Sequence, residues 1–267
     1  FTEIAKRDFA PPAGEPRVYG FYRKEIGIYD EAALREYIVL NILQMEVLDR
    51  AIGKVLDALR EAGQYDDSII IFTADHGEMN GERCLVDKGV YGHPKVARIP
   101  LIVKGPKKHT RTVSEPVCLL DLAPTILKAA GVRPRARFDG SSLWPLVFDD
   151  KRARKAFVER TFLFEAIWHM CPNPAVSIQW RKSRKEHYFY TYNLTSDFDE
   201  LYDLADTSYR NIARKPSAKR IRRRMLLRLA EFLKSDPRWR CYWHTLRTDR
   251  QGELPVEGGD HQLFRPE

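Results

Sequence analysis

The sequence predicts an α/β domain followed by a small α+β subdomain. Three features lead to this prediction: a long amphipathic helix pattern, two short apolar strands after it, and a change near residue 157 to aromatic and β-branched clusters separated by turn residues. Helix followed by buried strand is typical of α/β domains, whereas clustered short strands favour an antiparallel sheet. The chain has 267 residues, a net charge of +8 at pH 7 and 43% hydrophobic residues, which indicates a globular protein without a membrane-spanning stretch.

The first half of the chain contains a helix and two strands. Residues 1–29 are rich in proline and lack a sustained period, so we expect an entering loop there. From Asp30, a candidate N-cap, apolar residues recur at threes and fours until Gly63, which predicts a long helix. The run 68–73 is β-branched and apolar, as in a parallel strand buried on both faces, and 100–104 is a second candidate.

The second half changes character. A helix is predicted over 119–130, ending at Gly131, and residues 132–150 read as a linker. Beyond residue 157 we expect a small antiparallel sheet and then one helix after Ser217. The expected organisation is therefore an α/β portion with its linker at 1–150, the antiparallel-sheet subdomain at 151–240 and a tail at 241–267.

Chemistry is concentrated in the segment Thr73–Glu78, at the carboxyl end of the first predicted strand, where open α/β sheets bind ligands. Asp75 offers a hard anionic oxygen and His76 a neutral nitrogen, a pair compatible with Ca²⁺, Mn²⁺, Mg²⁺ or Zn²⁺. Alternatively, Asp75 caps the following turn and His76 is an ordinary loop residue. Lys88 could return to the same rim and oppose the charge of an oxyanion, although most loop lysines are simply solvated.

Further short sequence motifs precede and follow this segment in a fixed order along the chain. They are Ile69–Glu78, Lys88–Gly89, Arg98–Val103, Gly105–Pro106, Pro116–Thr125, Ala130–Val132, Asp139–Leu143 and Glu200–Leu204. This ordered series, from about Tyr37 to Leu233, resembles the sulfatase family of the alkaline-phosphatase superfamily. The resemblance implies that residues 1–150 form part of a mostly parallel sheet flanked by helices. It also implies that the protein hydrolyses sulfate esters with the help of one divalent cation. We expect Ca²⁺ as this cation, with Mn²⁺ or Mg²⁺ as alternatives.

The resemblance also implies roles for individual residues. Asp75 and His76 match the downstream metal pair of the family, and Lys88 matches the lysine that contacts the oxygens of the ester, so we take Lys88 as a catalytic and substrate-binding residue. His93 and Pro94 stand where relatives often carry Tyr followed by an acidic residue. We count His93 as a candidate catalytic residue that lines the pocket; the alternative is that it only shapes its loop.

The sequence departs from the family at the nucleophile. The family uses a Cys or Ser in a C/S-x-P-x-R pattern, converted to formylglycine, and two more metal ligands from an acidic pair near the chain start. This sequence contains no such pattern and begins at Phe1 without Met. We therefore expect that the N-terminal half of the catalytic domain is missing and that this piece alone is inactive. The natural substrate, compartment and oligomeric state stay open.

Two other functions remain as alternatives. One is a phosphodiester or phosphonate monoester hydrolase of the same superfamily; the other is a non-catalytic sulfatase-like protein with a basic surface. Residues 151–240 contain 21 Lys and Arg against 10 Asp and Glu, which could attract nucleic acid, anionic glycans or lipid. Charge runs are usually solvated faces, and no nucleic-acid motif accompanies them. We expect a small-molecule or glycan sulfate ester as the partner, and no nucleic acid.

Overall fold

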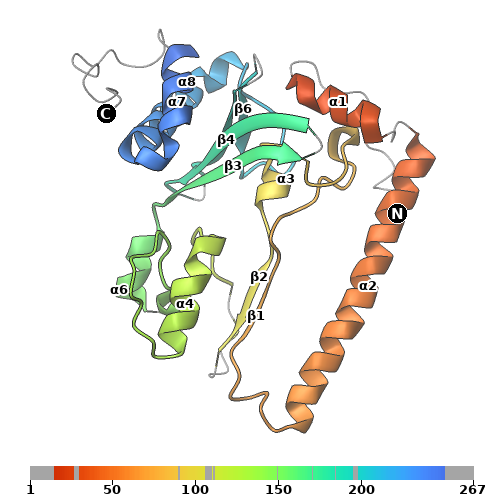
Figure 1. Ribbon diagram of the computed structural model, residues 1–267, viewed down its shortest axis with the longest axis vertical. Helices are drawn as coiled ribbons and strands as arrows, with labels where there is room; N and C mark the ends of the chain where they lie inside the picture. The colour runs from red at the N-terminus through yellow and green to blue at the C-terminus, as the bar shows by residue number, and fades with distance from the viewer. Residues whose placement is uncertain are drawn as a thin grey trace.

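The structure is a computed structural model that describes residues 15–26, 30–89, 91–105, 110, 112–148, 150–169, 171–183, 185–194 and 198–249. The described strands form a four-stranded sheet and a two-stranded ribbon. Figure 1 shows helices beside the larger sheet, and the ribbon running away from it between a long helix and a cluster of short ones. No described helix is long and apolar enough to cross a bilayer. The architecture is α/β with an antiparallel C-terminal sheet, as predicted.

The long helix is α2, Glu31–Glu61. The Asp30 side chain accepts hydrogen bonds from the first free amides of the helix, and Gly63 follows its end with a φ of +67° that favours glycine. The predicted helix is therefore confirmed at both ends. Only Leu34 and Ile38 are buried. The apolar residues farther along α2 are exposed: Leu40, Leu43, Met45, Val47, Leu48 and Val55.

The two predicted strands exist, as β1, Ile70–Thr73, and β2, Leu101–Lys104. They pair with each other antiparallel, not in a parallel sheet, because residues 74–100 turn the chain back alongside β1 without a crossover to its other end. Neither strand is buried on both faces: Phe72 is 37% exposed and Ile102 63%. The apolar run thus predicted the strands correctly, but the burial that it also predicted is incomplete in this chain.

Short helices connect the ribbon to the C-terminal sheet. After β1 come η2, Glu82–Cys84, and α3, Pro94–Ala97. The predicted helix at 119–130 is split into η3, Leu119–Asp121, and α4, Leu122–Ala129. The linker is not featureless. It contains α5, Trp144–Val147, and leads into α6, Lys151–Arg154, and η4, Lys155–Phe157.

The C-terminal sheet is antiparallel throughout, as predicted, in the order β3-β4-β5-β6. Its strands are β3, Thr161–His169; β4, Cys171–Arg181; β5, His187–Asn193; and β6, Glu200–Asp203. Alternate residues of β4 to β6 form two different buried faces. One is mostly apolar and contains Val176, Ile178, Tyr190, Tyr192 and Leu201, and the other contains the buried polar residues Ser177, Thr191 and Glu200.

The apolar face packs against the C-terminal helices, the predicted α7, Lys219–Ser235, and α8, Arg240–Asp249. The short helix η5, Pro216–Ala218, precedes α7, and η6, Pro237–Trp239, lies between α7 and α8. Met225, Leu226, Leu229 and Leu233 line the buried side of α7. The expectation of a tail from residue 241 is wrong for its first residues, since α8 buries Tyr242, Trp243 and Leu246 in the same core.

The entering segment also contains a helix that the sequence analysis missed. Residues 17–26 form α1, Arg17–Ile26, whereas the first 14 residues lie outside the described part of the chain. Tyr19 and Tyr22 are fully buried against Met79, Leu85 and Tyr91. Gly20 in the middle and the absence of an acidic first turn weaken the local helix signal, so tertiary packing stabilises α1.

Candidate active site

The two predicted metal ligands lie side by side on the loop that follows β1. The Asp75 side chain is 85% exposed, and its Oδ2 lies 3.5 Å from Nε2 of His76. The backbone N–H of His76 donates to Asp75 Oδ1 at 2.9 Å; this bond, together with the His76 ring and the Lys88 ammonium, lowers the pKa of Asp75 below its usual value. Asp75 is therefore a carboxylate at neutral pH, as a cation ligand requires.

Lys88 comes close enough to Asp75 for its charge to lower the pKa of that carboxyl. Its own backbone N–H donates to Asp87 Oδ1 at 2.6 Å, which helps to fix the turn that carries it. The structure thus places Lys88 within electrostatic range of Asp75, which lies beside His76, although Lys88 comes from a separate loop. This proximity was predicted from the order of motifs along the chain.

His93 is enclosed, whereas the Asp75 side chain is exposed. His93 is fully buried at the N-cap of α3, where its Nδ1 accepts the Lys95 amide at 3.2 Å. Its ring lies 4.9 Å from that of Tyr202 and 6.1 Å from that of Tyr209, measured between centroids. Burial, with smaller contributions from Arg83 and Lys95, keeps the pKa of His93 well below its usual value, so the ring is neutral. The Nδ1 contact supports the loop-shaping alternative, whereas Nε2 is buried and has no hydrogen-bond partner among the described residues, so the catalytic role of His93 stays a prediction.

The helix α3 also determines where Asp75 and His76 lie. The backbone N–H of Gly77 donates to Val96 O at 2.7 Å, and a Cβ on Gly77 would lie 1.9 Å from Lys95 O. Only glycine therefore lets the loop after β1 approach the backbone of α3 so closely. The sequence analysis did not identify this contact, because nothing local to Gly77 indicates which segment it meets.

The amino-terminal part of α2 supports the next residues of the loop. The Tyr37 hydroxyl donates to Glu78 Oε1 at 3.1 Å, and the same oxygen accepts the Asn80 amide at 3.0 Å. Asn41 Nδ2 donates to Asn80 Oδ1 at 3.3 Å. These contacts connect residues 78–80, in the loop after β1, to the long helix α2.

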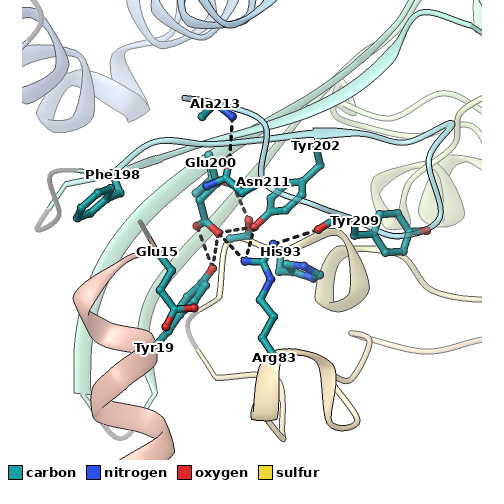
Figure 2. A network of polar contacts seen from close by, with 12 residues as sticks. Glu15, Tyr19, Arg83, His93, Phe198, Glu200, Tyr202, Tyr209, Asn211 and Ala213 are labelled. Carbon is teal, nitrogen blue, oxygen red and sulfur yellow. Dashed lines mark hydrogen bonds and ion pairs between the residues drawn. The ribbon is translucent and has the colours of Figure 1, made fainter. Parts of the chain in front are cut away.

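A second polar cluster, the Glu200 network, could not be predicted from the sequence (Figure 2). It joins side chains from four elements around one buried carboxylate. Its members are Tyr19 of α1, Arg83 of η2, Asn193 of β5, and Glu200 and Tyr202 of β6. Residues 83 and 200 are far apart in the sequence, so only the folded chain reveals that they meet.

Asp75 and His76 fit part of a cation site. Both are accessible donors of the kinds that bind divalent cations, and Asp75 is ionised. Across the described residues, no cluster of three or more His, Cys, Asp or Glu side chains could hold a metal ion. The pair could provide two ligands at most, and a complete site would need more donors.

Many of the C-terminal basic residues have acidic partners. Arg222 pairs with Asp199 at 3.1 Å, Arg224 with Glu186 at 3.1 Å and Arg228 with Glu159 at 3.3 Å. The guanidinium of Arg228 also lies over the Trp180 ring, 4.3 Å from its centroid. Ion pairs within the subdomain therefore neutralise part of the positive charge of residues 151–240.

The comparisons with known proteins agree with the fold and the loop motifs. Over 86% of the chain, the structure resembles a putative sulfatase from Bacteroides thetaiotaomicron with a TM-score of 0.63 and 24% identity, which shows a shared fold. Residues 37–132, which include Asp75, His76 and Lys88, match the family model described as Sulfatase. Over this segment, the chain is similar to the sulfatase family of the alkaline-phosphatase superfamily.

Two curated relatives show how much of such a protein the chain covers. The multifunctional alkaline phosphatase superfamily protein PehA of Trinickia caryophylli is 37% identical over 126 residues, which are 46% of this chain and 24% of the relative. The N-acetylglucosamine-6-O-sulfatase of Bacteroides thetaiotaomicron is 30% identical over 185 residues, 64% of this chain and 30% of the relative. The chain also covers 47% of the solved sulfatase. It thus spans less than half the length of each.

Proposed function

We propose that this chain is part of a sulfuric ester hydrolase whose substrate is a small-molecule or glycan sulfate ester. The observation that carries the proposal is that Asp75 lies beside His76 and within electrostatic range of Lys88, in the segment that matches the Sulfatase model. The similarity to a sulfatase of an N-acetylated amino sugar supports a sulfated sugar as the substrate class.

Asp75, His76 and Lys88 suit the stabilisation of a charged oxyanion. Asp75 and His76 would hold a divalent cation, with Ca²⁺ as our first choice and Mn²⁺ or Mg²⁺ as alternatives, because the Asp75 carboxylate is a hard oxygen donor of the kind that all three cations bind. Such a cation, when bound, opposes negative charge that develops on the ester oxygens. Lys88 would donate from its ammonium to a non-bridging oxygen of the same ester, and the low pKa of Asp75 keeps that side chain ionised for its role.

The nucleophile and the remaining metal ligands would come from polypeptide outside this chain. No C/S-x-P-x-R pattern occurs in the sequence, and among the described residues Asp75 and His76 are not joined by a third ligand. The exposed apolar residues of α2 and Ile102 of β2 offer a surface for such a segment to cover. We propose that a hydroxyl of a hydrated formylglycine, formed from a Cys or Ser of that segment, would bond to the ester sulfur while the bond between sulfur and the departing alcohol breaks. The chain alone would then be inactive.

A phosphodiester or phosphonate monoester hydrolase is the second candidate. The phosphonate monoester hydrolase of Silicibacter pomeroyi has a TM-score of 0.52 and 28% identity to this chain. The charge of the ester group does not exclude either substrate at this site, because a cation and an ammonium stabilise both oxyanions. If the third candidate is correct and the protein is a non-catalytic sulfatase-like protein, we expect it to hydrolyse none of these esters.

The test uses the protein encoded by the complete gene. We expect hydrolysis of p-nitrophenyl sulfate to be faster than that of bis(p-nitrophenyl) phosphate or p-nitrophenyl phenylphosphonate. Asp75→Ala should lower kcat/KM about 1,000-fold and reduce the bound metal, since a cation contributes several kcal/mol to the transition state. Asp67→Ala, at an exposed aspartate in the turn before β1, is the matched control and should retain both.

Three results would contradict parts of this proposal. A faster reaction with the phosphonate or the phosphodiester would replace the sulfatase assignment with the second candidate. Full turnover and full metal content in Asp75→Ala would exclude this residue as a ligand. No turnover of any ester by the complete protein would favour the non-catalytic candidate.

A further inference from the structure

The loop that carries Lys88 has a strained backbone. Asn80, Arg83, Cys84 and Asp87 all have positive φ angles, between 46° and 64°, a conformation that side chains with a Cβ rarely adopt. Several such residues in one short loop persist only where surrounding contacts hold them. The position of Lys88 therefore depends on what fixes residues 80–87.

Arg83 provides the strongest attachment of this loop. Its side chain is 8% exposed, lies 3.7 Å from Glu200 Oε1, and donates to the Tyr202 hydroxyl at 3.3 Å and to Tyr209 O at 3.0 Å. Its carbonyl oxygen accepts a hydrogen bond from Arg23 Nε at 2.9 Å. Both the backbone and the side chain of Arg83 are thus held by residues distant in the sequence, and Figure 2 shows the side-chain contacts.

Glu200, the partner of Arg83, is itself completely enclosed. Its carboxylate accepts the Tyr19 hydroxyl at 2.9 and 2.8 Å and Asn193 Nδ2 at 3.2 Å, and it also accepts the Tyr202 hydroxyl. These donors replace the water that the carboxylate loses on burial. A carboxylate held in this way gives Arg83 one defined position.

The other end of the loop is attached to the same face of the sheet. Thr191 Oγ1 donates to Gly92 O at 2.7 Å, and a Cβ on Gly92 would lie 2.1 Å from Thr191 Cγ2. Thr191 also bonds to Ser177 of the neighbouring strand at 2.8 Å. The chain is therefore attached to the polar face of the C-terminal sheet on both sides of Lys88, at Arg83 before it and at Gly92 after it.

We propose that Arg83 and Glu200 are positioning residues for Lys88: through them the C-terminal sheet sets the place of the Lys88 ammonium opposite Asp75 and His76. This inference rests on the proposed function, because it assigns the Glu200 network a part in ester hydrolysis. A displacement of about 1 Å at a catalytic group can cost on the order of 100-fold in rate, so a loosened loop has a measurable effect.

The experiment compares variants of the complete protein. Glu200→Gln removes the charge but keeps the shape, Arg83→Met removes the anchor, and Arg83→Lys keeps the charge without the guanidinium fork. Asp199→Asn is the matched control, since Asp199 is also buried, next to Glu200, and pairs with Arg222 at 3.1 Å, far from the Lys88 loop in sequence.

We expect Arg83→Met and Glu200→Gln to lower kcat for p-nitrophenyl sulfate about 10- to 100-fold, with KM and bound metal nearly unchanged. Arg83→Lys should recover part of the loss, and Asp199→Asn should keep kcat within about threefold of wild type. Unchanged kcat in Arg83→Met and Glu200→Gln, or an equal loss in Asp199→Asn, would overturn the positioning role.

A second readout does not depend on turnover. Cys84, next to Arg83, is 6% exposed, so its reaction with a maleimide, followed by mass spectrometry of the peptide, reports opening of the loop. Labelling should accelerate at least about tenfold in Arg83→Met and not in Asp199→Asn. If the wild type hydrolyses no ester, the proposed function fails while this measurement still decides whether Arg83 holds the loop; equal labelling rates would overturn that attachment.

Discussion

Gly77 limits how the loop after β1 can be built. Its absent side chain leaves room for Lys95 O, which would lie 1.9 Å from a Cβ. Gly77→Ala should therefore force the loop away from α3, lower the free energy of unfolding by about 1–3 kcal/mol, and reduce metal binding at Asp75. Urea unfolding and metal analysis of the complete protein measure both effects.

Gly53→Ala is the control for that substitution. Gly53 lies inside α2 with no atom within 4 Å of its added Cβ, so alanine should stabilise the helix by up to about 1 kcal/mol. If Gly77→Ala retained the stability and the metal content of wild type, the close approach to α3 would not control the position of Asp75 and His76.

Sequence alone identified the residues of the candidate site but not their supports. Asp75 and His76 are adjacent and follow an apolar strand, so local order was sufficient to select them. Arg83 and Glu200 act together across more than a hundred residues, and each looks like an ordinary charged residue in its own segment. His93 shows the opposite problem, because a histidine in a loop near a site gives no sign of complete burial.

At the scale of elements, the predictable parts were those with strong local patterns. The helix α2 was predicted from its apolar period and Asp30, and α7 from its apolar stripe. By contrast, α1 and α8 were missed because they are short and gain their stability from buried aromatic residues that contact distant segments. The antiparallel pairing of β1 with β2 also depends on the course of the connection between them, which the apolar run does not specify.

Asp121 joins η3 and the linker to the start of β3. Its buried carboxylate accepts the Cys118 and Ser141 amides at 2.9 and 2.8 Å and binds Arg160 through two bonds of 2.8 Å. Asp121→Ala should leave Arg160 without its partner and lower the free energy of unfolding by about 3–5 kcal/mol, as measured by urea unfolding.

The exposed pair Asp139–Arg238 is the comparison for this prediction. These side chains are also an aspartate and an arginine, 2.9 Å apart, but both are more than half exposed. Asp139→Ala should therefore cost less than about 1 kcal/mol. Similar losses in the two variants would mean that the Asp121 contacts do not join these elements as tightly as their burial indicates.

At the scale of the whole molecule, the two faces of the C-terminal sheet pack against different parts of the chain. The apolar face with α7 and α8 forms the largest core cluster among the described residues. The polar face receives α1, the Lys88 loop and α3, so the C-terminal sheet and the candidate site are parts of one assembly. The candidate site thus depends on both halves of the chain, although the candidate groups that this chain contributes to it lie within residues 75–88.

The stability of this assembly should depend on pH through His187 of β5. Burial, with help from the charges of Arg181 and Arg98, lowers the pKa of His187 to about 4. In the unfolded chain an unperturbed histidine has a pKa of about 6.5, so between these values the unfolded state binds more protons at this residue. The contribution of His187 is therefore complete above pH 6.5 and is lost as the pH falls towards 4.

Urea midpoints measured from pH 7.5 to 4.5 test this dependence. In His187→Gln, which keeps a polar group beside Gln179, the decline between pH 6.5 and 4.5 should be shallower than in wild type. His244→Gln also removes a histidine, from an exposed position of α8, and is measured beside it as the comparison for the loss of one imidazole. Parallel curves for wild type and His187→Gln would show that His187 does not link protonation to the folding of the sheet.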